Sequence, residues 1–267
     1  MRESPPLTLT FLGTGTSIGV PSVGCDCPVC RSNDPINQRF RSSIWLRSGG
    51  LSWVVDTGPD FRSQCLRAGI RHLDAALFTH AHTDHVMGFD DLRRFTLGAG
   101  ASLPVHATAA TLDFLHRAFA FAFDGEHRYP GYFKPDPRPV IGSFLLGDFL
   151  VTPIPVIHGR VETIGYLFSR DDRKLLAYIP DAKVVPEESL ALLSGVEVLV
   201  LDALRPREHP THLSVSEALE IVAAVAPRQA WLTHFSCEMD FREVGPSLPM
   251  GVQLAHDGLE LEIGSEE

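Results

Sequence analysis

The apolar residues of this chain fall into short segments, some with the alternating spacing of strands and others with the wider spacing of amphipathic helices. The segments predicted as strands are 7–13, 42–48, 51–56, 74–80, 102–107, 149–157, 164–169, 174–179, 196–202 and 229–234. Those predicted as helices are 60–69, 108–123, 185–195 and 211–227. Strands that alternate with helices stand beside runs of consecutive strands, so we expect an α/β (α+β) protein with two sheets and helices outside them.

Turn-forming residues separate these segments. Gly49–Gly50 lies between two predicted strands, as the turn of a hairpin. The segment 252–263 is predicted as another hairpin, with Asp257 and Gly258 at its turn. Residues 124–139 are rich in proline, glycine and aromatic residues, which predicts a long loop.

The composition is that of a globular protein. Its 267 residues are 44% hydrophobic, and neither a repeat nor a linker divides them, so we expect a single domain over 1–267. The formal net charge is −10 and no block of lysine and arginine occurs. This argues against extended nucleic acid as a partner but allows a small phosphorylated ligand. Without an apolar run of membrane-spanning length or a secretory signal, the expected location is the cytoplasm, with no membrane partner.

A cluster of histidines follows the predicted strand 74–80, in the stretch FTHAHTDHVMGF. His80 and His82 are two positions apart and would project from the same side of an extended chain. Asp84 and His85 follow where the chain turns into a helix, and would point to a neighbouring position. Imidazole and carboxylate groups are metal ligands, so the full pattern predicts a metal site, whereas a lone His-x-His would also suit a solvated turn.

Further ligands must come from the ends of other predicted strands. Three polar residues end apolar runs in this way: His158 after VTPIPVI, Asp181 after KLLAYIP and His234 after QAWLT. Each alone would also fit a loop residue or a strand-end cap. Their shared placement favours a role as metal ligands.

In residue type, order and approximate spacing, this pattern resembles the dinuclear metallo-β-lactamase-fold hydrolases. The resemblance covers nearly the whole chain and implies an αββα four-layer sandwich with the site at one edge of its two sheets. It implies a first metal held by His80, His82 and His158. It implies a second metal held by Asp84, His85 and His234, with Asp181 as the bridge between the two.

The loop over about 13–38 contains a second candidate metal site. Cys25, Cys27 and Cys30 form a C-x-C-x-x-C pattern, and thiolates this close in a cytoplasmic protein suggest zinc. A closed structural zinc site needs four ligands, and Cys237 is the expected fourth. A set of free buried cysteines is the alternative.

The first residues of this loop indicate a particular branch of that family. LGTGTSIGVP followed by the cysteine pattern resembles the PhnP-type phosphodiesterases, which open a phosphoribosyl 1,2-cyclic phosphate. In them three loop cysteines and a histidine hold a structural zinc, and here Cys237 stands in the place of that histidine. PqqB-like proteins of quinone-cofactor biosynthesis share a glycine-rich opening and a cysteine loop, so the loop alone does not fix the substrate.

These features lead us to expect a metal-dependent phosphoric diester hydrolase that acts on a small cyclic phosphate or nucleotide-like phosphodiester. Its cofactors would be two divalent ions (Zn²⁺ or Mn²⁺) at the active site and one structural Zn²⁺. Two such ions can share a hydroxide that attacks phosphorus, with Asp84 and Asp181 as catalytic ligands. The alternatives are a PqqB-like carrier or oxidative role and a tRNase Z-like nuclease, which would need an RNA-gripping arm and a basic face. A homodimer is implied by resemblance alone.

A leaving group needs a proton, and His209 and His212 stand near the start of a predicted helix. The resemblance favours His212 as this catalytic acid, although a surface residue near a helix cap would look the same. Ser214 and Glu217 have the spacing of a capping box. Ser214 and the helix N-terminus could also contact a phosphate.

Several other positions have two interpretations. Asp56 matches an aspartate that the resembling family carries after an early strand, where it would orient a ligand histidine or cap a turn. Arg41 would contact the substrate or form a structural salt bridge, and Cys65 is expected in the core. The loop 124–139 has aromatic residues that would cover a sugar or base, or pack on the surface: Tyr129, Tyr132 and Phe133.

Overall fold

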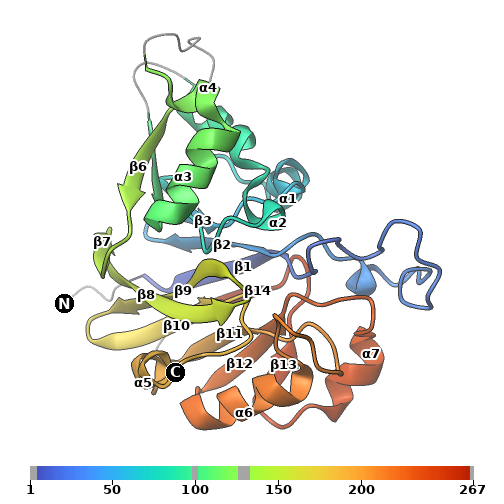
Figure 1. The fold of residues 1–267 in the computed structure, drawn as a ribbon. Helices are drawn as coiled ribbons and strands as arrows, with labels where there is room; N and C mark the ends of the chain where they lie inside the picture. Colours follow the sequence, from blue (N-terminus) through green and yellow to red (C-terminus); the bar gives the residue numbers. More distant parts are fainter. Residues whose placement is uncertain (1–4, 98–101, 126–132, 265–267) are drawn as a thin grey trace.

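The computed structural model describes residues 5–97, 102–125 and 133–264, which form two seven-stranded sheets packed face to face (Figure 1). The first sheet has the order β14 (Glu260–Ile263), β1 (Leu7–Gly13), β2 (Ser43–Ser48), β3 (Leu51–Val55), β4 (Ala75–Leu77), β5 (Leu103–Ala107) and β6 (Pro135–Pro139). The second sheet has the order β13 (Val252–Leu254), β12 (Gln229–Thr233), β11 (Val198–Asp202), β10 (Arg173–Ile179), β9 (Val161–Arg170), β8 (Phe149–His158) and β7 (Phe144–Leu146).

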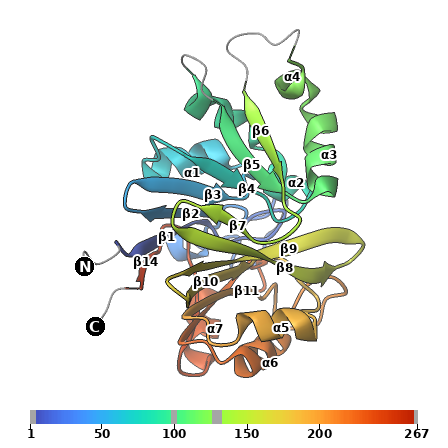
Figure 2. The ribbon, with the colours of Figure 1, turned by 90° about the vertical axis from the view of Figure 1, so that its left-hand side faces the viewer.

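Helices lie on the outer side of each sheet (Figure 2). Those on the side of the first sheet are α1 (Phe61–Ala68), α2 (Thr83–Val86), the 3₁₀ helix η2 (Phe89–Thr96), α3 (Ala109–Ala118) and α4 (Ala120–Phe123). Those on the side of the second sheet are α5 (Glu187–Leu193), α6 (Val215–Val225) and α7 (Phe241–Val244). The remaining 3₁₀ helices of the described residues are η1 (Pro35–Asn37) and η3 (Gly245–Ser247). None of the helices in the described ranges is long and apolar enough to cross a membrane.

Three apolar layers follow from the alternation of side chains along the strands. Leu46 of β2 and Tyr166 of β9 pack in the layer between the sheets. Val54 of β3 packs with Phe61 of α1 in the layer beneath the first set of helices. Leu199 of β11 lies in the third layer, beneath the helices of the second sheet. The architecture is therefore the αββα sandwich of the metallo-β-lactamase fold, which confirms the predicted fold class.

The carboxyl ends of several strands meet at one edge of this sandwich. The pairs β3–β4 and β4–β5 are parallel in the first sheet, and β10, β11 and β12 are parallel in the second. Because parallel strands end on the same side of a sheet, polar residues that follow them are brought together there. This is the edge at which the candidate site forms.

Besides element ends, the secondary structure differs from the sequence prediction at several elements. The predicted loop 124–139 ends in strand β6, whose prolines are accommodated because β6 is an edge strand of its sheet. The short edge strand β7 was not predicted. The predicted helix 108–123 is divided at Phe119, whose φ of −124° and ψ of 40° interrupt it between α3 and α4.

The predicted hairpin over 252–263 is wrong. β13 pairs in parallel with β12 in the second sheet, whereas β14 pairs antiparallel with β1 in the first. The Asp257 carboxylate lies at this crossing with a side chain only 4% exposed. It accepts hydrogen bonds from the Thr14 amide and hydroxyl and from the Phe40 amide, each at 2.8 Å. The Asp-Gly pair therefore joins two sheets instead of two neighbouring strands.

Replacing Asp257 with alanine should destabilise the fold, because it leaves the amides of Thr14 and Phe40 without their buried acceptor. We expect the free energy of unfolding to fall by about 2 kcal/mol or more. Urea denaturation checks this. Glu262→Ala, on the exposed side of β14, is the control and should change the value by less than about 0.5 kcal/mol. Equal stability of the two variants would contradict a structural role of Asp257.

Candidate metal centre

The first group of ligand atoms comes from both sheets. His80 follows β4, His82 precedes α2, His158 ends β8 and Asp181 follows β10. Their ligand atoms all lie within 4.8 Å of one another. His82 Nδ1 is 2.9 Å from His80 Nε2 and 3.2 Å from His158 Nε2. Asp181 Oδ2 lies 3.8 Å from His80 Nε2 and 3.5 Å from His158 Nε2.

The second group shares Asp181 with the first. It contains Asp84 and His85 of α2 and His234, which follows β12, again with all ligand atoms within 4.8 Å. His85 Nε2 lies 3.1 Å from Asp84 Oδ2 and 3.2 Å from Asp181 Oδ1. His234 Nδ1 lies 3.1 Å from the same Asp181 oxygen. The two carboxylate oxygens of Asp181 thus face different groups, as a bridging ligand requires.

Neighbouring side chains and carbonyls hold the rings in these orientations. Nδ1 of His85 bonds to Asp56 Oδ2 at 2.8 Å, and Nδ1 of His158 bonds to the carbonyl of Thr211 at 2.7 Å. Nδ1 of His80 lies 3.0 Å from Thr79 Oγ1. Each contact leaves Nε2 of the ring pointing to the centre of its group. Asp56 therefore lies where an orienter of a ligand histidine must lie.

The electrostatics suit divalent cations. Burial lowers the pKa of His80 well below its usual value and that of His234 to about 3. Both rings are therefore neutral and can offer a nitrogen lone pair to a metal. Burial opposes protonation of His85 too, but the surrounding carboxylates, led by Asp181, raise its pKa well above the usual range. Within the described residues, His85 Nε2, Asp181 Oδ1 and His234 Nε2 are buried without a hydrogen-bond partner. A bound cation would coordinate the inward-facing imidazoles and the unpartnered ligand atoms, and it would neutralise the excess carboxylate charge.

A pocket of about 600 Å³ opens onto both groups, and His212 lines it. Its ring stacks on His234 with 4.9 Å between centroids, and its Nδ1 lies 2.9 Å from Asp202 Oδ2. Burial opposes the charged form of His212, but the hydrogen bond and charge of Asp202, together with the charges of Asp181 and Asp84, raise the pKa of His212 above its usual value. His209 is not among the lining residues; its Nδ1 faces Thr211. His212 is thus the better placed of the two candidate acids.

Sequence reasoning missed Asp202, which is fully buried at the end of β11. Its Oδ2 also accepts from the backbone amide of Ala182, at 3.0 Å, next to Asp181. One carboxylate therefore connects the candidate acid to the strand end that supplies the candidate bridging ligand, Asp181. The available signal was position, because Asp202 ends an apolar run just as Asp181 and His234 follow theirs.

Other candidates lie elsewhere. Ser214 is fully buried and forms the capping box of α6 with Glu217, so it does not reach the pocket. Arg41 forms an ion pair with Asp60 at 3.0 Å, which supports the structural interpretation. Phe133 is fully buried in the apolar layer beneath the first set of helices, with its ring centroid 4.7 Å from that of Phe89. Tyr129 and Tyr132 lie outside the described residues.

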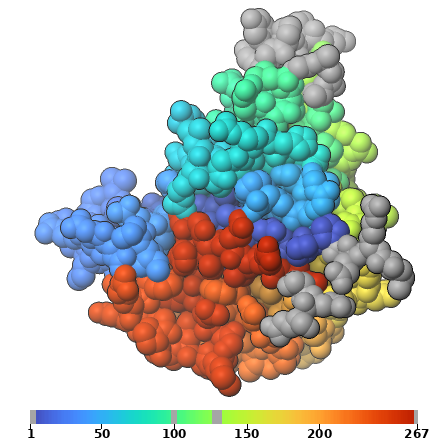
Figure 3. Space-filling model, turned by 180° about the vertical axis from the view of Figure 1, so that it is seen from behind, coloured from blue at the N-terminus to red at the C-terminus, as the bar shows by residue number. Residues whose placement is uncertain are grey.

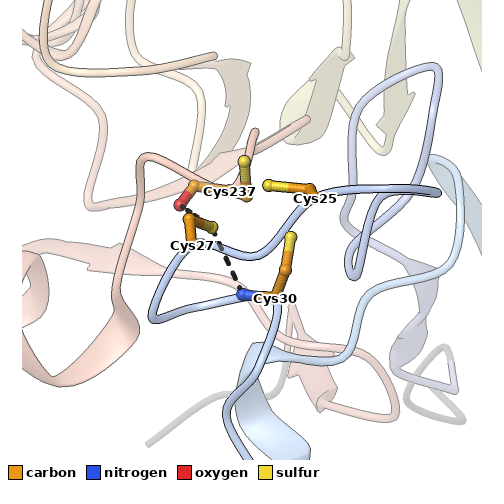
Figure 4. Close-up of side chains that lie close together, drawn as sticks. All are labelled: Cys25, Cys27, Cys30 and Cys237. Atoms are coloured by element: carbon orange, nitrogen blue, oxygen red, sulfur yellow. Dashed lines mark hydrogen bonds between the residues drawn. The ribbon is translucent and has the colours of Figure 1, made fainter.

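The four expected cysteines meet at a second centre (Figure 4). The sulfur atoms of Cys25, Cys27, Cys30 and Cys237 all lie within 4.8 Å of one another. The Cys30 amide points at Cys27 Sγ at 3.4 Å and lowers the pKa of Cys27 to about 7, while burial raises the pKa of Cys237 to about 12. Four converging thiols fit a tetrahedral zinc ion, which binds them as thiolates. Cys65 is separate and packs against the apolar layer beneath α1.

The cysteine loop projects from the sandwich beside the C-terminal segment (Figure 3). Arg39, only 3% exposed, ties the two together, because it donates to the carbonyls of Ser236 at 3.1 Å and Met239 at 2.6 Å. The amide of Thr16 donates to the carbonyl of Phe235 at 2.9 Å. The loop is therefore fastened to the residues that directly follow His234.

Comparison with known proteins agrees with this geometry. Residues 53–235 match the model of the β-lactamase superfamily domain. A solved structure described as a new diphosphatase from the PhnP family is 38% identical, with a TM-score of 0.89, over 97% of this chain and 98% of that one. The chain therefore belongs to the β-lactamase superfamily, as a metal-dependent hydrolase with the metallo-β-lactamase fold. Within that superfamily it is PhnP-like along almost its whole length.

Two curated relatives carry other names. An octanoyltransferase of Porphyromonas gingivalis is 36% identical over 94% of this chain, but the chain spans only 50% of that relative's length. A coenzyme PQQ synthesis protein B of Methylobacterium radiotolerans is 30% identical over 73% of this chain and 72% of its own length. The activities in the names of these two relatives differ from one another.

Alanine at Gly58 should disturb the second ligand group. An added Cβ there would lie 2.1 Å from the carbonyl oxygen of Asp84, so the turn that carries Asp84 and His85 must shift. We expect about one bound ion per chain fewer than in the wild type, measured by elemental analysis of the purified protein. Gly142→Ala is the control, since a Cβ at Gly142 meets nothing within 4 Å. Unchanged metal content in Gly58→Ala would contradict the proposed ligand role of this turn.

Serine at Cys237 should remove the zinc of the cysteine centre, because one of four thiolate ligands is lost. We expect about one zinc per chain fewer than in the wild type, again by elemental analysis. Cys65→Ser should leave the zinc content unchanged, since Cys65 is not in the cluster. The same zinc content in both variants would show that the cluster holds free thiols.

Proposed function

We propose that the protein is a metal-dependent phosphodiesterase that hydrolyses a small cyclic phosphate or nucleotide-like phosphodiester, with one divalent ion in each ligand group. The observation that carries this proposal is the sharing of Asp181 between two ligand groups that face one pocket with His212. The similarity to a protein described as a PhnP-family diphosphatase supports phosphoryl chemistry at such a site. We propose Zn²⁺ or Mn²⁺ for the active site and Zn²⁺ for the cysteine centre.

The residues of the site would bind the metal ions, orient a ligand histidine and transfer a proton. His80, His82 and His158 would hold one ion, Asp84, His85 and His234 the other, and Asp181 both. Two divalent ions held by these residues would supply an activated water for attack on phosphorus and would offset the charge that grows on the phosphoryl oxygens. Asp56 orients His85, which keeps its ligand nitrogen directed inward.

His212 acts on the leaving group. As water's oxygen bonds to phosphorus, the bond from phosphorus to the leaving oxygen breaks, and that oxygen must gain a proton. Asp202 accepts from Nδ1 of His212 and so stabilises the protonated ring, which can donate from Nε2. The proton released from the attacking water returns to solvent or to His212 and completes the cycle.

A PqqB-like carrier or oxidative role is the alternative, favoured by the 30% identity to coenzyme PQQ synthesis protein B. Such a role needs metal ligands but no acid for a leaving group. His212 lines the pocket and is paired with the buried carboxylate of Asp202, which favours hydrolysis. The net charge of −10 argues against the extended RNA substrate of a tRNase Z-like nuclease.

Assays of metal-loaded protein with bis(p-nitrophenyl) phosphate and a cyclic ribose phosphate test the proposal. We expect turnover of both by the wild type and loss by Asp181→Ala. His212→Ala should lower kcat about 10²- to 10⁴-fold for the cyclic phosphate, whose alkoxide must be protonated. The effect should be small for p-nitrophenolate, which leaves without a proton.

His209→Ala is the matched control and should behave like the wild type with both substrates. Metal analysis of the same samples should give about three ions per chain, two in the pocket and one with the cysteines. A fully metal-loaded protein that turns over neither substrate would favour the carrier or oxidative role.

A further inference from the structure

We propose that the groove between α1 and η2 is a binding site for a nucleoside polyphosphate, separate from the metal centre. The groove has a volume of about 590 Å³, which is in the range of pockets that hold whole small molecules. Among the described residues, it shares no lining residue with the pocket that opens onto the metal ligands. The proposal is therefore independent of the proposed hydrolysis.

The groove concentrates positive charge in an acidic chain. Four arginines and one carboxylate, that of Asp91, line it, whereas the whole chain has a formal net charge of −10. The arginines are Arg62, Arg71, Arg93 and Arg94. Asp91 lies near enough to Arg93 and Arg62 to interact with both charges, and Arg93 also pairs with Asp90 at 3.3 Å. The remaining excess of cationic groups attracts an anion that carries several charges.

Arg71 and Arg94 have no such partners. Neither side chain forms an ion pair or a hydrogen bond with any other residue that the structure describes. Both side chains are exposed at the groove. A guanidinium presents several donors in a planar fork that matches two oxygens of a phosphate. Two free forks that line one groove therefore suit a ligand with two or more linked phosphates.

The backbone on either side of the groove is held by hydrogen bonds and burial. At the end of α1, Ile70 is only 7% exposed and its amide donates to the carbonyl of Cys65 at 3.0 Å, directly before Arg71. At the end of η2, the hydroxyl of the buried Thr96 donates to the carbonyl of Arg93 at 3.0 Å. The arginines therefore extend from fixed backbone on both sides of the groove.

Part of the groove wall is apolar. Leu66 and Leu97 line the groove although they are 65% and 49% exposed, and the half-buried ring of Phe95 lies beside them in the lining. A ligand that covers these side chains removes apolar surface from water, and an aromatic base packs well against such a wall. A bare phosphate would contact only the arginines. The combined wall therefore favours a ligand that carries a base and sugar beside its phosphates.

Equilibrium dialysis of the metal-loaded protein with ATP, tripolyphosphate and adenosine tests the site, in excess Mg²⁺ so that the ligands leave the bound ions in place. We expect ATP to bind about tenfold or more tightly than either fragment, because only ATP contacts both the arginines and the apolar wall. Arg71→Gln and Arg94→Gln should each raise the Kd of ATP about tenfold or more. Arg94→Lys should recover part of the loss, because it keeps the charge but not the fork.

Two control variants separate this groove from other anion sites. Arg207→Gln removes an exposed arginine that pairs with Glu238 at 2.7 Å and does not line the groove, so the Kd of ATP should stay unchanged. Asp181→Ala alters the metal centre and should bind ATP like the wild type. ATP should also slow hydrogen exchange in residues 61–71 and 89–97. Without ligand, the arginine variants should match the wild type in metal content and melting temperature.

Three results would overturn the proposal. Loss of ATP binding in Asp181→Ala, with full binding by the arginine variants, would place the nucleotide at the metal centre. Equal affinity for ATP and tripolyphosphate would show that no nucleoside is recognised. Binding of hexaglutamate but not of ATP would identify the groove as a site for an acidic peptide. None of these measurements depends on turnover of a phosphodiester, so the groove and the proposed function are tested separately.

Discussion

The site depends on one buried carboxylate that must serve two groups of ligands at once. Asp181 directs Oδ2 to His80 and His158, and Oδ1 to His85 and His234. A buried carboxylate in this position is stable only with positive charge on both of its sides. The end of β10 must therefore lie within about one side-chain length of strand ends from both sheets. The face-to-face packing of the sheets brings these strand ends together.

Local backbone conformation shows how tightly these strand ends are fixed. Asp56 and His234 both have left-handed backbone, with φ of 64° and 62°, although neither is glycine. Such conformations cost about 1–3 kcal/mol and persist where surrounding contacts determine them. Asp56 is held by the amide and hydroxyl of Thr79, at 2.8 and 2.9 Å. His234 is held by Ser42 Oγ at 3.0 Å. Hydrogen bonds of the surrounding fold thus hold the strained residues of the site.

The cysteine centre joins the loop after β1 to the segment that follows His234. Three of its thiols come from the loop after β1 and the fourth from the segment after His234. Arg39 and the Thr16–Phe235 contact join the same two segments. A bound zinc would close this junction and so restrict the movement of His234. Asp202 links His212, the proposed acid, to the strand end at Asp181. The proposed ligands and the proposed acid are therefore parts of one connected framework.

The sequence by itself determined the fold class and which residue types could bind metal, because strand periodicity and the His-x-His-x-Asp-His and C-x-C-x-x-C patterns are local properties of the chain. It also indicated His158, Asp181 and His234, since each follows an apolar run. Asp202 also ends an apolar run, but its role depends on its hydrogen bonds to His212 and to the Ala182 amide, which only the tertiary structure shows. The sequence predicted a hairpin turn at Asp257, but the same Asp-Gly turn also suits a connection between two sheets. Only the buried hydrogen bonds to Thr14 and Phe40 distinguish the two arrangements. Which oxygen of Asp181 faces which histidine, and that His212 and not His209 lines the pocket, were decided by tertiary structure alone, because they depend on how separate strand ends pack in space.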